Sequence, residues 1–178
     1  MRVISGALFL LLFVSTTASA QSWVVQGSAG PTITDSGHSL AAAVGFSPTS
    51  RLTLLFDVQR THLFSRVTRD DHGGFSAFRG GTVTLASVEL RATIRGHDRV
   101  SPYVFGGTSA GISRPNVNET FPHPVTNQAR ALFFGGGIQV PLRGGMSVFA
   151  DVRMVGGVEG REGMLAFAPV RAGLAWRF

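Results

Sequence analysis

Charged residues in this sequence stand two positions apart within otherwise apolar stretches, and their spacing decides which chemistry they could support. Glu89 and Arg91 form one such pair, and Asp151 and Arg153 form another. Residues two apart on a β-strand project from the same face. If that face is enclosed, the charges must be paired and hydrogen-bonded, because burying an isolated charge is costly. We therefore predict an internal ion-pair network with Glu89 and Arg91 at its centre.

The network is expected to collect inward-facing residues from several strands. Such a set suits either a polar filling that makes an enclosed fold rigid or a gated narrow passage in which the pairs exchange partners. Its predicted members are Asp57, Glu89, Arg91, Asp151, Arg153, Arg171 and Arg177.

The cluster Asp70-Asp71-His72 is the best candidate for a metal site or an acid–histidine pair. Metal sites need three or four converging ligands, and only local ones are visible here. A solvated loop is therefore expected. We predict no catalytic residue, no metal site and no cofactor. All histidines lie in or beside expected loops and turns, namely His38, His62, His72, His97 and His123.

The elements that must position these charges alternate apolar and polar residues, in eight segments of about ten residues after Gln21. The last segment shows the pattern best, with Arg171 and Arg177 on the face opposite its apolar residues. This is typical of a membrane β-barrel, with one face toward lipid. The apolar residues of the last segment are Val170, Ala172, Leu174, Trp176 and Phe178.

Three further segments divide in the same way, and their charges stay on one face. Segment Tyr103–Ile112 is apolar on both faces, so its lipid side is left unassigned. The apolar faces of the three segments are Leu52, Leu54, Phe56 and Val58; Thr84, Ala86, Val88, Leu90, Ala92 and Ile94; and Val148, Ala150, Val152 and Met154.

The connections between segments alternate in length, which is typical of the periplasmic and extracellular ends of an outer-membrane barrel. An even number of strands then places both termini on the short-turn side. Tight turns are expected at Ser47–Ser50, Gly96–Arg99 and Leu142–Gly145, and loops at Thr34–Gly37, His62–Arg79, Arg114–Asn127 and Gly156–Gly163.

The first twenty residues are typical of a cleavable signal peptide. Met1 and Arg2 form a short positive region, Val3–Val14 is apolar, and Ala18-Ser19-Ala20 fits a cleavage site. The apolar run is too short to span a bilayer as a helix. We expect residues 1–20 to be removed and residues 21–178 to form one barrel domain.

Composition narrows the remaining possibilities. The chain has no cysteine, so no disulfide can stabilise it, and its 23 glycines disfavour helices. The formal net charge is +6, but the arginines are scattered singly, which argues against a nucleic-acid partner.

A soluble sandwich or lipocalin-like barrel would also alternate, with its charged face toward water. Aromatic residues at strand ends favour the membrane alternative, because they suit an interfacial girdle. These residues are Trp23, Phe46, Tyr103, Trp176 and Phe178.

The run from Val170 to Phe178 resembles the C-terminal strand of bacterial outer-membrane proteins, in which alternating apolar positions end on an aromatic residue. Together with the eight segments, it makes the chain similar to small barrels of the OmpA/OmpX type. The resemblance implies an all-β, eight-stranded, antiparallel up-and-down transmembrane barrel in the outer membrane. It also implies that this strand is recognised by the barrel assembly machinery.

The expected function is structural or surface interaction, with outer-membrane lipid, lipopolysaccharide or external ligands contacted by the loops. A narrow passive or gated channel is the alternative. A lipid A-modifying enzyme is a distant third, because a deacylase needs His, Ser and an acid on the lipid face, and a palmitoyltransferase-like barrel needs an apolar interior. Arginines suited to anionic sugars and phosphates are Arg60, Arg66, Arg69, Arg79, Arg114 and Arg130.

Overall fold

A computed structural model describes residues 22–33, 36–69, 75–78, 80–94, 100–117, 123, 125–160 and 163–178. The expected signal peptide lies outside these residues, as does the turn at 96–99. In the described part of the chain no helix is both long and apolar enough to cross a membrane.

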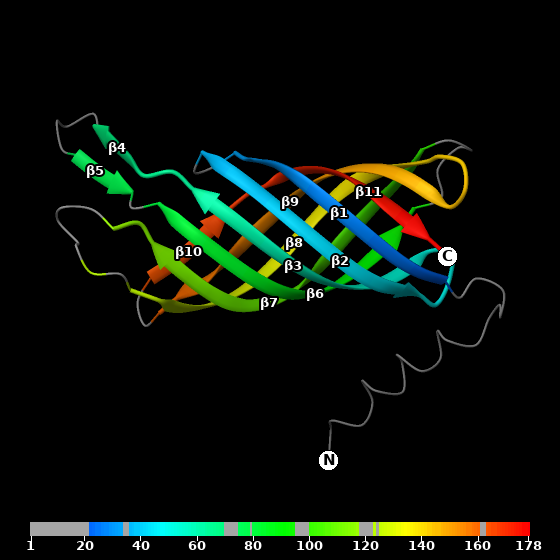
Figure 1. The fold of residues 1–178 in the computed structure, drawn as a ribbon, viewed down its shortest axis with the longest axis horizontal. Coiled ribbons are helices and arrows are strands. Elements are labelled where there is room, and N and C mark those ends of the chain that lie inside the picture. Colours follow the sequence, from blue (N-terminus) through cyan, green and yellow to red (C-terminus); the bar gives the residue numbers. More distant parts are fainter. Residues whose placement is uncertain are drawn as a thin grey trace, which may run out of the picture.

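The structure is an antiparallel, eight-stranded closed β-barrel, which confirms the predicted fold class (Figure 1). Its last strand is made of two pieces, β10 and β11, separated at Ala168 and Pro169. The barrel strands are β1 (Ser22–Thr32), β2 (Gly37–Ser47), β3 (Leu52–Leu63), β6 (Gly81–Thr93), β7 (Ser101–Pro115), β8 (Asn127–Pro141), β9 (Met146–Glu159), β10 (Gly163–Phe167) and β11 (Val170–Arg177).

The expected loop His62–Arg79 is more ordered than the sequence indicated. Strand β3 continues to Leu63, and a separate hairpin of β4 (Arg66–Arg69) and β5 (Phe75–Phe78) follows. This hairpin projects from one end of the barrel, here named the hairpin end (Figure 1). The opposite end, where β1 begins and β11 finishes, is named the terminal end.

The barrel closes where β11 pairs with β1, from Val24 opposite Arg177 to Ala29 opposite Ala172. At the terminal end Phe178 and Trp23 exchange backbone hydrogen bonds of 2.9 and 3.0 Å. Toward the hairpin end the seam is weaker, because Pro31 has no N–H to donate to the ladder with β11. Beyond Ala29 the described residues show an isolated bridge of Thr32 with Pro169, and Ile33 N donates to Ala168 O at 2.8 Å.

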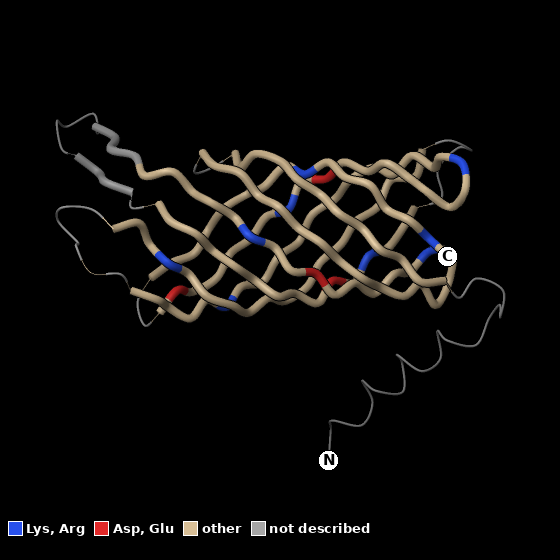
Figure 2. The backbone as a smooth tube through the Cα atoms, viewed as in Figure 1, with Lys and Arg blue, Asp and Glu red and all other residues tan. Residues whose placement is uncertain are grey.

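Residues that alternate in the sequence point alternately to the outer and the inner face of the barrel wall. On β6, Leu90 is 56% exposed while its neighbours Glu89 and Arg91 are 0% and 4% exposed. On β3, Phe56 points outward and Asp57 inward in the same way. The faces predicted for these strands and for β9 and β11 agree with the structure wherever side chains are described. Figure 2 shows the charged positions along the strands.

Strand β7, which could not be assigned from sequence, turns its aromatic residues inward. Tyr103 is 1% and Phe105 5% exposed, whereas Val104 between them is 51% exposed. Tyr103 was predicted in the interfacial girdle, and that prediction is wrong. Its hydroxyl group finds a partner inside the barrel, where it donates a hydrogen bond to Asp151.

Glycines on β8 make room for these rings. A Cβ on Gly135 would lie 2.5 Å from Phe105 Cζ, and a Cβ on Gly137 would lie 2.8 Å from Tyr103 Cζ. Both glycines face inward, directly beside β7 in the sheet. Gly135 and Gly137 are therefore required by close packing inside the barrel.

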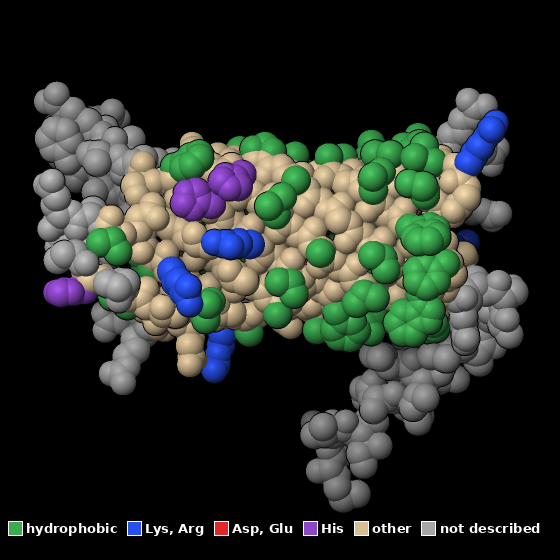
Figure 3. Space-filling view, viewed as in Figure 1, with side chains coloured by type: hydrophobic (Ala, Val, Ile, Leu, Met, Phe, Trp, Pro, Cys, Tyr) green, Lys and Arg blue, Asp and Glu red, His purple; other side chains and the backbone are tan. Residues whose placement is uncertain are grey.

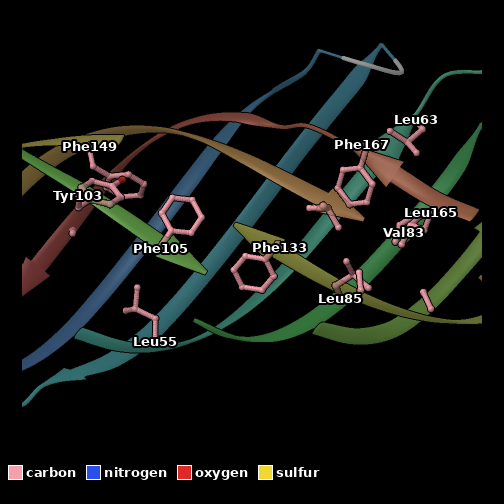
Figure 4. Packing of buried hydrophobic residues seen from close by; sticks show 14 of the residues in the cluster. Leu55, Leu63, Val83, Leu85, Tyr103, Phe105, Phe133, Phe149, Leu165 and Phe167 are labelled. Atoms are coloured by element: carbon pink, nitrogen blue, oxygen red, sulfur yellow. The ribbon is translucent and has the colours of Figure 1, made fainter. Parts of the chain in front are cut away.

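The interior is charged in one part and apolar in another. The expectation of a charged interior, which argued against a palmitoyltransferase-like barrel, is therefore correct for only part of the lumen. Toward the hairpin end it is filled by apolar side chains, including Leu63, Val83, Leu165 and Phe167 (Figure 4). The charged residues and Tyr103 occupy the middle and the terminal side. Because the apolar part is occupied by the protein's own side chains, it is a core.

Candidate functional site: the interior charge network

The charged part of the interior is built from four strands of the wall. All its acidic and basic members are at most 4% exposed. Alternation directs each of them inward, and the closed barrel brings the strands face to face across the lumen. The members are Asp57 on β3, Glu89 and Arg91 on β6, Asp151 and Arg153 on β9, and Arg171 on β11.

Arg153 spans the lumen from β9 to strands on the opposite wall. Its Nη2 atom donates to Asp57 Oδ2 at 2.7 Å and to Glu89 Oε2 at 2.6 Å. Its Nη1 atom donates to Gln59 Oε1 at 3.0 Å. Because β9 pairs with neither β3 nor β6, these bonds connect walls that share no backbone hydrogen bonds.

Glu89 is shared between two arginines. Nε and Nη2 of Arg91 donate to Glu89 Oε1 at 3.1 and 2.9 Å, while Arg153 occupies the other carboxylate oxygen. Arg91 also donates through Nη1 to Gln26 Oε1 on β1 at 3.3 Å. This places Glu89 at the junction between β1, β6 and β9.

Arg171 and Asp151 form a two-pronged pair. Nε donates to Oδ1 at 2.7 Å and Nη2 to Oδ2 at 2.9 Å. The hydroxyl group of Tyr103 donates to the same Oδ2 at 2.9 Å. Nη1 of Arg171 lies 3.6 Å from Asp57 Oδ2, so this pair is linked electrostatically to Arg153.

Aromatic rings cover the guanidinium groups. The Cζ atom of Arg91 lies 4.4 Å from the centre of the Tyr103 ring, and that of Arg153 lies 4.2 Å from the centre of the Phe133 ring. Such contacts favour a cation and exclude water. Phe105 lies within about 6 Å of all three guanidinium groups.

The structure brings six of the seven predicted residues together, as three acids and three arginines with a formal charge of zero. Arg177 is the exception and was wrongly included. It has inward parity, but as the last residue of β11 it is exposed at the rim and makes none of the ion pairs found among the described residues.

Several participants were missed from sequence, namely Gln26, Gln59, Phe105 and Phe133. Inward parity could have identified Gln59, because it lies two residues after Asp57 on the same face of β3. Phe105 on β7 and Phe133 on β8 carried no such signal, because the residues around each of them are apolar on both faces of the strand. The arrangement can hold the opposite walls together and fill the lumen with paired charges, of which two atoms, Asp57 Oδ1 and Arg153 Nε, have no hydrogen-bond partner among the described residues.

The other candidate groups give no second site. Asp70, Asp71 and His72 lie outside the described residues. Within the described part of the chain no three His, Cys, Asp or Glu residues are grouped to hold a metal. His38 and His62 lie on strands rather than in loops, and their rings are 5.4 Å apart on the outer wall.

The terminal strand presents its apolar residues outward. Leu174, Trp176 and Phe178 are 52%, 55% and 63% exposed. Trp176 packs against Phe178, and Trp23 packs against Phe46, with ring centres 5.5 and 5.7 Å apart. Four of the five aromatic residues predicted for a girdle therefore lie together on the outside of the terminal end.

No family model and no curated protein matches this chain. Among solved structures, it is similar to Neisserial surface protein A, with a TM-score of 0.68 at 12% identity, covering 88% of this chain and 97% of that one. The N-terminal β-barrel domain of Pseudomonas aeruginosa OprF gives a TM-score of 0.61 at 13% identity, with the same coverages.

A third similar structure is Ail, the attachment invasion locus protein of Yersinia pestis, solved in complex with the heparin analogue sucrose octasulfate. The TM-score is 0.55 at 14% identity, covering 89% of this chain and 98% of that one. At these identities the likeness concerns the fold. The chain has the fold of small eight-stranded outer-membrane barrels.

Proposed function

We propose that the protein is an integral outer-membrane barrel without enzymatic activity, whose role is structural or consists of contacts made by its outer surface. The distribution of apolar residues carries this proposal. Every long strand exposes a large apolar side chain, which in a soluble protein would mark an aggregation-prone surface. Examples are Val25, Leu40, Phe56, Leu90, Val104, Leu132, Met154 and Leu174, which are 46–67% exposed.

The acidic residues support the same assignment. All four carboxylates with described side chains have inward parity: Asp57, Glu89, Asp151 and Glu159. A soluble barrel turns its carboxylates toward water and its large apolar residues inward, whereas this barrel turns its described carboxylates inward and many large apolar residues outward.

The ends of the barrel suggest its orientation. Aromatic residues at the terminal end suit a membrane–water interface, and short turns are typical of the periplasmic side. We assign the terminal end to the periplasm and the hairpin end to the exterior. Residues 1–20 are proposed to be the signal peptide that directs export, and the strand ending at Phe178 to be recognised by the assembly machinery.

The filled interior favours a structural role over transport. Three guanidinium groups and their aromatic covers meet in the middle of the lumen. One observation favours the alternative of a gated narrow channel. Because Glu89 and Asp57 each lie within ion-pair distance of two arginines, the pairs have a second partner available.

A heat-modifiability gel of membrane fractions tests the proposal. The protein is expected in the outer-membrane fraction and should migrate differently before and after heating, because a folded barrel resists detergent. Recovery as a soluble periplasmic protein without such a shift would contradict it.

Conductance in planar bilayers separates the two roles. The structural role predicts no channel activity from the wild-type protein, and steady single-channel steps would favour the channel. A shift in lipid A mass on expression would instead support an enzyme.

A further inference from the structure

Basic side chains gather on the outer wall near the hairpin end, in contrast to the aromatic residues at the terminal end. His38 on β2, His62 on β3 and Arg114 on β7 lie in one row, in which His62 and Arg114 are each paired with Thr82 on β6. Figure 3 shows histidine and arginine side chains together on this part of the wall and no coloured acidic side chain on the same face.

The arginines in this region are exposed to solvent, and their N–H groups are available to bind a ligand. Arg60 and Arg114 are exposed, and neither forms an ion pair with any carboxylate whose side chain is described. Nδ1 of His62 lies 3.3 Å from Thr82 Oγ1. Arginine on the lipid side of a barrel is destabilising at the bilayer midplane but is tolerated near the interface. These residues therefore fit the level of lipid headgroups.

A shallow apolar groove begins directly beside the basic group formed by His38, Arg60, His62 and Arg114. Its volume is about 660 Å³, and it crosses the outside of β1, β2, β3, β6 and β7. Ala42, Ala86 and Ala110 create the hollow, because their short side chains lie among larger ones such as Phe56 and Val88.

Groove and basic group are continuous. Arg60 follows the lining residue Val58 on the same face of β3, and Arg130 on β8 is paired with the lining residue Ala110. Cations at one end and an apolar channel leading away match an amphiphile with an anionic head. Arginine guanidinium groups bind phosphate through paired hydrogen bonds.

We propose that this wall is a binding site for a phosphorylated membrane lipid, with the phosphate held by Arg60, His62 and Arg114 and one hydrocarbon chain in the groove. The site rests on the proposed membrane location. It goes further because it assigns lipid recognition to the barrel wall, where the sequence had pointed to the loops.

The test uses the refolded barrel in neutral detergent and follows binding by native mass spectrometry. Lipid A is the probe, and diacylglycerol and inorganic phosphate are the separate apolar and anionic parts. The wild-type protein should retain lipid A at concentrations where neither part binds. The double variant Arg60→Gln/Arg114→Gln should weaken lipid A binding at least about tenfold, the factor expected from losing two charge-assisted contacts.

Matched controls separate the two halves of the site. Arg51→Gln/Arg143→Gln removes two exposed arginines from turns at the other end and should leave binding unchanged. Ala86→Leu fills the groove and should weaken lipid A binding without removing a charge. Equal binding by wild type and Arg60→Gln/Arg114→Gln would overturn the proposal, as would an equal loss in the Arg51→Gln/Arg143→Gln control. All variants should keep the heat-modifiable migration, so failure of the lipid site is distinguishable from failure of the barrel assignment.

Discussion

Glu89 shows how much a single residue can depend on its surroundings. Its two carboxylate oxygens serve different arginines on different strands, and the residue is 0% exposed. Removing one partner from a buried ion pair is more damaging than exchanging the whole pair, because it leaves an uncompensated charge.

Glu89→Ala is therefore expected to destabilise the folded barrel by about 3–5 kcal/mol. Arg91 would keep its aromatic contacts and its hydrogen bond to Gln26, and the interior would carry an excess positive charge. Urea unfolding in phospholipid vesicles measures the free energy of unfolding.

Glu159→Ala provides the matched control, because Glu159 lies at the end of β9 and has one described hydrogen bond, from Asn127. Its loss should cost about 1 kcal/mol. If Glu89→Ala were no more damaging than Glu159→Ala and left conductance unchanged, the network would not stabilise the barrel.

The inward face could be assigned from sequence for strands with large apolar residues on one face and charges on the other, as in β3, β6, β9 and β11. Strand β7 could not, because its orientation depends on Gly135 and Gly137 in the neighbouring strand, which leave space for Phe105 and Tyr103. The partners of Arg153 were also beyond sequence, since they depend on how the barrel closes. Membership of the network followed from parity, but its pairing required the three-dimensional arrangement.

Gly135→Ala tests this packing. The added methyl group would meet the Phe105 ring and the backbone oxygen of Val152. Phe105 cannot move freely, because it packs beside Arg153 and Arg171. Overpacking of this kind costs about 1–3 kcal/mol.

Gly156→Ala is the control on the adjacent strand, where an added Cβ meets nothing within 4 Å. It should leave the urea midpoint of unfolding unchanged or raise it slightly. Equal effects of the two substitutions would refute the role assigned to Gly135.

The whole molecule has an outer surface suited to lipid and different chemistry at its two ends. Aromatic side chains lie together at the terminal end on β1, β2 and the end of β11, and arginine and histidine lie near the hairpin end. The free-energy cost of placing a charge on the apolar band between them should therefore depend on how deep the position lies in the bilayer.

Val88→Arg places a charge on the outward face near the middle of β6, and Ile94→Arg places one on the same face just beyond its end. The first should cost about 2–4 kcal/mol and the second about 0–1 kcal/mol in lipid vesicles. Comparable costs at both positions would show that this wall does not face a bilayer.

The seam between β1 and β11 has a consequence for the order of folding. Every other strand pair of the barrel joins neighbours along the chain, whereas this pair joins residues near the two ends, so its loop-closure entropy is the largest. We expect the hairpins to form early and the seam last. Because Pro31 weakens its hairpin end, closure should begin where Trp23 meets Phe178 and proceed toward the hairpin end, so that these two aromatic residues make the first contact of the last strand pair to form.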